Sequence, residues 1–225
     1  MRSKQRLALI SAVACLICNY GCGGGKSADG SAQELTGRAS VTIAWPEDSR
    51  LIPLASNSIR IDFKKSGQVV DSKLVPRPTT GNIATVTSEP LPTGDLIAFA
   101  AAFPQANGSG VAQSNGTVPL VISAGKTSTF LISMTSTIED VSVVAAKGTI
   151  AAGESTTLSI TAKDAGGNIV LISPSLLNWE ALNPNVARIN SSGVVLGLTP
   201  GQATFKVTET ESGRAAQTTI TITGN

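Results

Sequence analysis

The side chains of this chain that could do chemistry are thiols and carboxylates, because the sequence contains no histidine. Histidine is the commonest general base and the commonest protein ligand for transition metals. All three cysteines stand near the amino terminus, at Cys15, Cys18 and Cys22. A thiol there can be alkylated or acylated, whereas the rest of the chain has no cysteine with which to form a disulfide. Thiol chemistry is therefore confined to the first 22 residues.

Carboxylates stand close together at Glu47-Asp48, at Glu139-Asp140 and at Glu209 with Glu211. The oxygens of Glu139 and Asp140 could bind calcium between the two halves described below, but no Asp- and Asn-rich ligand loop accompanies them. A glycosidase would need two carboxylates about 5–10 Å apart in a cleft, and none of these pairs carries such a motif. We therefore expect Glu139-Asp140 to be a solvated pair at a strand end, and we expect no catalytic residue, no metal, no cofactor and no enzyme.

Residues 1–21 have the layout of a secretory signal. A basic start at Met1–Arg6 precedes an apolar run from Leu7 to Cys18. Twelve residues are too few to cross a hydrocarbon layer of about 30 Å as a helix, but they suit the core of a signal. Around Cys22 the sequence resembles a bacterial lipoprotein signal, with Gly21 as the small residue before the acceptor cysteine.

The resemblance implies that Cys22 is acylated, for example with palmitate, and that the mature protein is anchored in a membrane of the cell envelope. Two or more acyl chains suffice for stable attachment. Asn19 stands where the family usually has Leu, and Ala12–Cys15 offers a second processing site. An ordinary cleaved signal with a free Cys22 is the alternative. Gly23 after the cysteine favours an outer membrane or cell-surface location, and residues 22–36 are predicted to form a flexible tether.

Residues 137–223 show apolar residues at every second position between turn residues. Leu158, Ile160 and Ala162 alternate with polar side chains, and Asp164–Asn168 supplies residues that tolerate positive φ. Roughly seven such runs, about 8–12 residues apart, predict an antiparallel sandwich of two sheets. The low contents of charged residues (14%) and aromatic residues (4%) agree with short strands joined by turns.

Within this half, the run from Trp179 to Phe205 closely resembles the bacterial immunoglobulin-like domain, group 2. The resemblance rests on Trp179, Asn183-Pro184, Val186, Ala187, Gly193, Gly197, Pro200, Gly201 and Ala203. We expect Trp179 to fill the space between the sheets, and Gly193 and Gly201 to permit turns. Gly197 should mark a bulge or a close backbone approach. The resemblance implies a spacer or adhesion-type module of envelope proteins.

Residues 37–135 follow the same pattern, so they predict a second sandwich. Val41 and Ile43 alternate with polar residues, and the run Ser58–Phe63 does the same. The segment Leu91–Gly94, which precedes an apolar run, loosely resembles the transthyretin-like sandwich of carboxypeptidase regulatory domains. Thr135–Thr137 is the predicted hinge between the two halves.

Binding surfaces have two candidates in this half. Trp45 at a strand end could present its ring to a sugar, although a buried tryptophan is the simpler interpretation. The small, polar stretch Ala106–Thr117 could be a recognition loop or a plain surface loop. Without Arg2, Lys4 and Arg6, 14 basic residues remain against 15 acidic ones, a net charge of −1. Nucleic-acid binding is therefore not expected.

Together these patterns predict an all-β protein: two tandem antiparallel Ig-like β-sandwich domains after a lipoprotein signal and a flexible tether. The predicted function is that of a non-enzymatic cell-envelope lipoprotein with a structural, adhesion-type or spacer role. The alternative is a surface protein that binds carbohydrate or peptidoglycan. The predicted partners are the membrane, through the lipid anchor, and other surface proteins or glycans.

Overall fold

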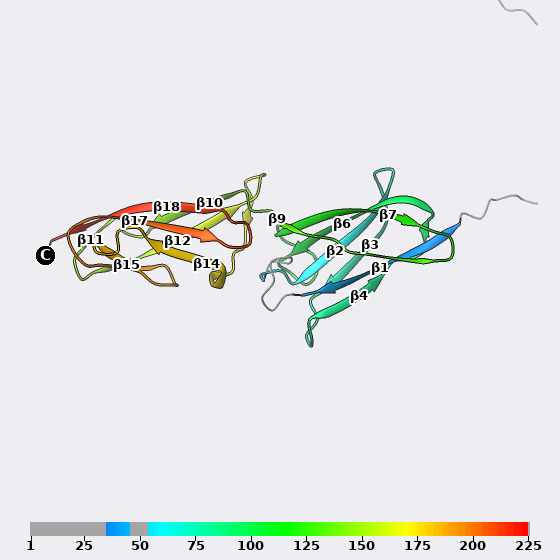
Figure 1. The fold of residues 1–225 in the computed structure, drawn as a ribbon, viewed down its shortest axis with the longest axis horizontal. Coiled ribbons are helices and arrows are strands. Elements are labelled where there is room, and N and C mark those ends of the chain that lie inside the picture. The colour runs from blue at the N-terminus through cyan, green and yellow to red at the C-terminus, as the bar shows by residue number, and fades with distance from the viewer. Residues whose placement is uncertain (1–34, 46–53, 225) are drawn as a thin grey trace, which may run out of the picture. The chain divides into compact units, whose positions relative to one another are not determined.

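The computed structural model describes residues 35–45 and 54–224, and their regular secondary structure is almost entirely β-strand (Figure 1). The predicted leader and tether up to Glu34, with Cys22, and the pair Glu47-Asp48 lie outside the described residues. The strands of the first half are β1 (Thr36–Ala44), β2 (Ser58–Lys65), β3 (Gln68–Pro76), β4 (Ile83–Thr87), β5 (Leu91–Pro92), β6 (Gly94–Phe103), β7 (Ser114–Ile122), β8 (Thr127–Phe130) and β9 (Thr135–Ser136).

Two sheets form the first half. One has the order β3-β2-β6-β7-β9, and in the other β1 pairs with β4, β5 and β8. The pairing of β1 with β8 is parallel, and the other pairings are antiparallel. Ser66 and Gly67 join β2 to β3 with φ values of 50° and 83°. Positive φ at both central residues is the geometry that continues the strand twist through a two-residue hairpin.

The core between these sheets consists of the apolar residues that alternate in the sequence. Val41 and Ile43 face inward from β1, and Ile59, Ile61 and Phe63 face inward from β2. Phe63 meets Phe130 edge to face, with ring centroids 6.0 Å apart, which is a favoured arrangement for an aromatic pair. The period-two pattern of the sequence is therefore the pattern of burial.

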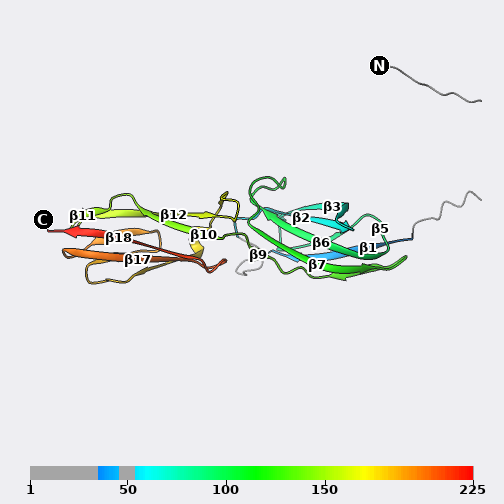
Figure 2. The same ribbon diagram turned by 90° about the horizontal axis from the view of Figure 1, so that it is seen from above.

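The second half is also a pair of sheets, seen from another side in Figure 2. One sheet has the order β10-β12-β16-β15 and the other the order β11-β18-β17-β14. These are the ABED and GFC orders of an immunoglobulin-type sandwich, with β11 added in parallel beside β18. The elements are β10 (Asp140–Ala145), β11 (Thr149–Ala151), β12 (Ser155–Lys163), β13 (Ile169–Val170), a 3-10 turn at Pro174–Leu176, β14 (Leu177–Ala181), β15 (Ala187–Ile189), β16 (Val194–Gly197), β17 (Gly201–Glu209) and β18 (Ala215–Thr223).

The all-β prediction is confirmed by this strand pairing. The predicted hinge is misplaced, because Thr135 and Ser136 form β9 and pair with Asn115 and Ser114 of β7. The segment between the last strand of the first half and the first strand of the second is therefore residues 137–139. The described residues include no helix that is long and apolar enough to cross a membrane.

Candidate functional site

The residues that resemble the group 2 domain lie in and around the core of the second half. Ala187 and Ala203 are fully buried, and Val186 packs beside them. The side-chain oxygen of Asn183 accepts a hydrogen bond from the backbone N–H of Thr204 at 3.0 Å. Asn183 thereby ties the turn before β15 to β17, which is a structural role.

The glycines of this set are placed where a side chain would collide or strain the backbone. Gly193 has a φ of 76°, and a Cβ there would lie 3.1 Å from the ring of Trp179. A Cβ on Gly197 would lie 3.0 Å from the carbonyl oxygen of Ala151. Trp179 is half-buried against the core, so it fills the space between the sheets only in part. Pro200 precedes Gly201, whose φ is 151°. None of these contacts forms a reaction site.

The interpretation of Trp45 as a sugar platform is wrong, because the side chain is only 1% exposed and belongs to the core of the first half. The guanidinium of Arg77 lies 5.6 Å from the centroid of its ring. A ring enclosed in this way cannot stack on a sugar from solvent. The indole N–H is buried without a hydrogen-bond partner among the described residues.

The predicted recognition loop Ala106–Thr117 is shorter than expected. Ser114–Thr117 belongs to β7 and pairs with β6, which leaves residues 106–113 as the loop. Asn107 stabilises a tight turn there, because its side-chain oxygen accepts hydrogen bonds from the backbone N–H and the hydroxyl of Ser109. The polar residues of this loop therefore serve its own conformation.

The acidic pairs are engaged in local structure. Glu139 forms an ion pair with Arg214. Glu209 is fully buried and accepts hydrogen bonds from the backbone N–H groups of Glu211 and Ser212 and from the Ser212 hydroxyl, which fixes the turn between β17 and β18. In the described part of the chain, no group of three or more Cys, Asp or Glu residues could hold a metal ion.

Glu211 lies beside this turn and accepts a hydrogen bond from the backbone N–H of Leu54 at 3.1 Å. Burial raises the pKa of the Glu211 carboxyl, and the negative charge of Glu209 raises it further, against the opposing hydrogen bond from Leu54. A carboxyl with a raised pKa can be a general acid. The titratable groups that line the same hollow, Glu139 and Arg214, are paired with each other. We interpret Glu211 as a structural residue.

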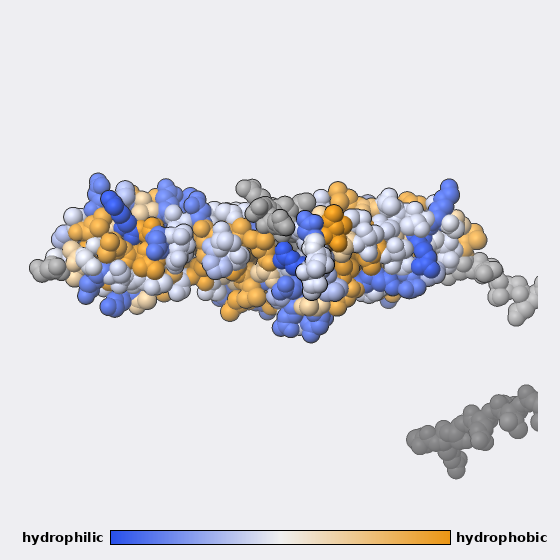
Figure 3. All heavy atoms as spheres, turned by 90° about the horizontal axis from the view of Figure 1, so that it is seen from below, coloured by the Kyte–Doolittle hydropathy of each residue, from blue (hydrophilic) through white to orange (hydrophobic). Residues whose placement is uncertain are grey.

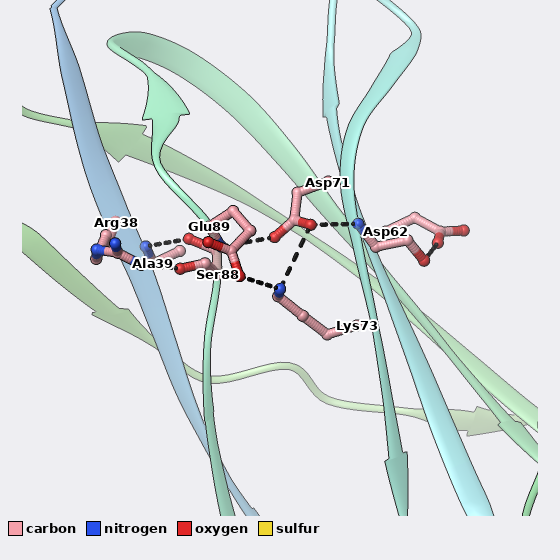
Figure 4. Close-up of polar contacts among 8 residues, drawn as sticks. Arg38, Ala39, Asp62, Asp71, Lys73, Ser88 and Glu89 are labelled. Atoms are coloured by element: carbon pink, nitrogen blue, oxygen red, sulfur yellow. Dashed lines mark hydrogen bonds and ion pairs between the residues drawn. The ribbon is translucent and has the colours of Figure 1, made fainter.

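The densest set of charged contacts is a charged clasp of Asp71, Lys73 and Glu89, which sequence reasoning missed (Figure 4). The ammonium nitrogen of Lys73 lies 2.9 Å from a carboxylate oxygen of Glu89 and 3.7 Å from one of Asp71. The backbone N–H of Glu89 donates to the other oxygen of Asp71 at 2.9 Å. These contacts join the edge strand β3 to the segment after β4. No sequence motif could have indicated them, because the partners lie 16 and 18 residues apart.

The hydrogen bond between the side chains of Lys73 and Glu89 is the main cause of the pKa shifts of both groups. It raises the pKa of Lys73 and lowers the pKa of Glu89. Next to the clasp, Arg38 donates to the carbonyl oxygen of Ser88 at 2.7 Å, and the Ser88 hydroxyl accepts from the N–H of Ala39 at 3.0 Å. The cluster joins the two sheets on this side of the sandwich.

On the outer face of the β3-β2-β6-β7 sheet, two cations cover two aromatic rings. The guanidinium of Arg60 lies 5.0 Å from the Phe103 centroid, and the ammonium of Lys64 lies 4.9 Å from that of Phe99. Such cation–π contacts contribute about 0.5–1 kcal/mol each at exposed sites. Because the rings are capped by cations, this face offers no open aromatic platform.

One apolar groove of about 120 Å³ opens beside the end of β1. It is lined by Ile43, Ile59, Ile61, Ala100 and Met134, among others. The groove exists because β8 pairs with β1 only as far as Val41 and Phe130, after which the chain leaves toward β9. On the face drawn in Figure 3, hydrophobic and hydrophilic residues are intermixed.

Comparison with known proteins does not assign the chain to a family. No protein-family model and no curated protein matches it. Solved structures that are similar include a fragment of intimin in complex with its translocated receptor (18% identity, TM-score 0.28, covering 76% of this chain and 53% of that one). Others are domains 1–6 of the surface layer protein SbsC (15%, 0.30, 86% and 42%) and the fimbrial anchor protein Mfa2 from Porphyromonas gingivalis (10%, 0.36, 80% and 80%).

The chain spans about half the length of the intimin fragment and less than half of the SbsC chain. TM-scores of this size add nothing to the strand orders given above. The fold assignment therefore rests on the strand pairing of the chain itself. Its class is that of an all-β protein with two antiparallel sandwiches in sequence.

Proposed function

We propose that the chain is a non-enzymatic lipoprotein of the bacterial cell envelope, in which two sandwiches at 37–135 and 137–223 project from a lipid on Cys22. The observation that carries the proposal is the order of its parts. A basic and apolar leader ends at Gly21-Cys22, and a small, polar tether then precedes the strands of the two sandwiches. Such an order suits a module that is displayed on a surface and contacts other surface components.

The contacts of the acidic side chains support a structural role. Asp71 and Glu89 belong to the charged clasp, and Glu139 and Glu209 are occupied by Arg214 and by a turn. An acid–base pair would need two groups with free access to a shared substrate. The alternative of carbohydrate or peptidoglycan binding rested mainly on Trp45, which is buried. We therefore place protein contact and spacing ahead of glycan binding.

Metabolic labelling with a palmitate analogue tests the anchor. The wild-type chain and the Cys18→Ser variant should both incorporate the label, because the proposed acceptor is Cys22 in both. The Cys22→Ser variant should incorporate none. Equal labelling of the wild type and the Cys22→Ser variant would refute the lipid anchor at this position, and unlabelled wild-type protein would favour an ordinary cleaved signal.

A further inference from the structure

Strand β4 is an edge strand of its sheet, and its outward backbone groups are unpaired within the described residues (Figure 1). The backbone N–H of Trp45 donates to Asn82, and that of Ser88 donates to Ala39. These two bonds fix the alternation along the antiparallel pair, so Ala84 and Val86 point their backbone groups toward β1. Ile83, Thr85 and Thr87 therefore point theirs away from the sheet.

The side chains of β4 do not protect this edge. Natural edge strands commonly carry charged residues that prevent pairing with another chain. β3 carries Asp71 and Lys73, β10 carries Asp140 and β14 carries Glu180, whereas β4 has the sequence Ile-Ala-Thr-Val-Thr. β8, β9 and β11 are also uncharged and lie at sheet edges, but each has fewer residues than β4. The Ser128 hydroxyl of β8 donates to the Val121 carbonyl of β7 at 2.9 Å.

The inner face of β4 is incompletely covered. Ala84 and Val86 pack against the core of the first half but are only partly buried. On the outer face, Ile83 is 63% exposed. A strand added beside β4 would place its side chains next to those of β4 on both faces and would satisfy the free backbone groups of Thr85 and its neighbours.

We propose that β4 pairs antiparallel with β4 of a second copy of this chain, about a two-fold axis at Thr85. In this register Thr85 faces its own symmetry mate, and Ala84 of each copy faces Val86 of the other. The inward-facing side chains of both copies stay on the core side and the outward-facing ones stay on the solvent side, and the pairing brings no like charges together. The contact is isologous, as expected for a two-fold dimer. Because β4 has only five residues, we expect a weak dimer, and the fraction of the protein that is dimeric should rise with protein concentration.

The proposal does not depend on the lipid anchor. If the chain is also held on a membrane, confinement raises the effective concentration of copies and favours the same pairing. The two proposals can fail separately, since labelling of Cys22 and pairing of β4 are measured in different variants.

Cross-linking of the full chain tests the register. At a directly opposed, hydrogen-bonded position the Cα atoms are about 5.5 Å apart, which suits a disulfide. Thr85→Cys should give a disulfide that joins position 85 of two copies under mild oxidation, identified as a linked peptide by mass spectrometry. The matched control is Thr157→Cys, an exposed position within β12 of the second half, which should not link. Absence of the peptide linked through position 85, or equal linking of both variants, would overturn the proposal.

Sedimentation of the full chain in density-matched detergent gives an independent readout. The wild type and Thr85→Val should show dimer that increases with concentration. Thr85→Lys, which opposes two ammonium groups on the axis, should associate about tenfold more weakly or not at all. All three should share one melting temperature within a few degrees, because residue 85 is exposed. A monomeric wild type at all concentrations, or unchanged association of Thr85→Lys, would contradict the pairing.

Discussion

At the scale of single residues, the strongest constraints are glycines that allow close packing. Gly116 in β7 has an extended backbone, yet a Cβ there would collide with the carbonyl oxygen of Ser133 and would lie 2.8 Å from a methyl group of Ile132. The segment after β8 crosses β7 at this point. The sequence alone did not single out this glycine, because the contact joins residues that are distant along the chain.

We predict that Gly116→Ala lowers the free energy of unfolding by about 1–3 kcal/mol, the usual cost of forcing an extra carbon into a packed site. Gly148→Ala is the control, since a Cβ at Gly148 would have no atom within 4 Å. Urea denaturation monitored by circular dichroism measures both variants. Equal stability of the Gly116 variant and the wild type would show that the two segments do not approach as described.

Glu209 is a second decisive residue. It is fully buried and its carboxylate accepts three hydrogen bonds in the turn that follows β17. We predict that Glu209→Ala destabilises the protein by about 2–4 kcal/mol, because the donors of Glu211 and Ser212 are left buried without their acceptor. Glu180→Ala, at an exposed position of β14, should change stability by less than about 0.5 kcal/mol. Urea denaturation measures both variants. If Glu209→Ala changes the free energy of unfolding as little as Glu180→Ala does, the turn is not held as described.

At the scale of elements, the charged clasp on β3 should make stability depend on pH. The hydrogen bond from Lys73 lowers the pKa of Glu89 in the folded state, so the ionised Glu89 stabilises that state. This contribution is complete above the pKa of unfolded glutamate and is lost as the pH falls through the lower, folded value. Glu211 has the opposite sign, because its raised pKa makes the folded state gain stability as the pH falls through that raised value toward the unfolded one.

We therefore predict that the wild type is more stable than Glu89→Gln at neutral pH and that the difference disappears in acid. Unfolding curves of the two proteins, measured from neutral pH down to about pH 3 at low salt, give the difference. Because the side chains of Lys73 and Glu89 are solvent-accessible, added salt should reduce the difference. A difference that persists unchanged in acid would assign the effect to something other than the charge of Glu89.

The elements also show how far the sequence could lead. Alternation at Val41 and Ile43, and at Leu158, predicted strands with one buried face, because a period of two leaves no other way to bury those side chains. Burial of Trp45 is the simpler interpretation of the sequence, and the structure confirms it. Its contact with Arg77 could not be predicted, because the two residues are far apart along the chain. The extent of the loop after Phe103 could not be predicted either, because Ser114–Thr117 is polar and gains its strand from pairing with β6.

At the scale of the whole molecule, we predict that residues 137–225 fold without the first half. Their strands pair only with one another, and their sheets enclose a core of their own. The isolated segment should give a strand-type circular dichroism spectrum and a single cooperative melt. A disordered spectrum would mean that the second half needs the first in order to fold, and the proposed domain boundary would then be wrong.

The central claim is that the two sandwiches are held at the cell envelope by a lipid on Cys22. Mass spectrometry of the amino-terminal peptide of the protein, isolated from its native membranes, tests this claim most directly. The account predicts that the mature chain begins at Cys22 and carries the added mass of acyl chains on that residue. A mature chain that begins elsewhere, or an unmodified Cys22, would contradict it.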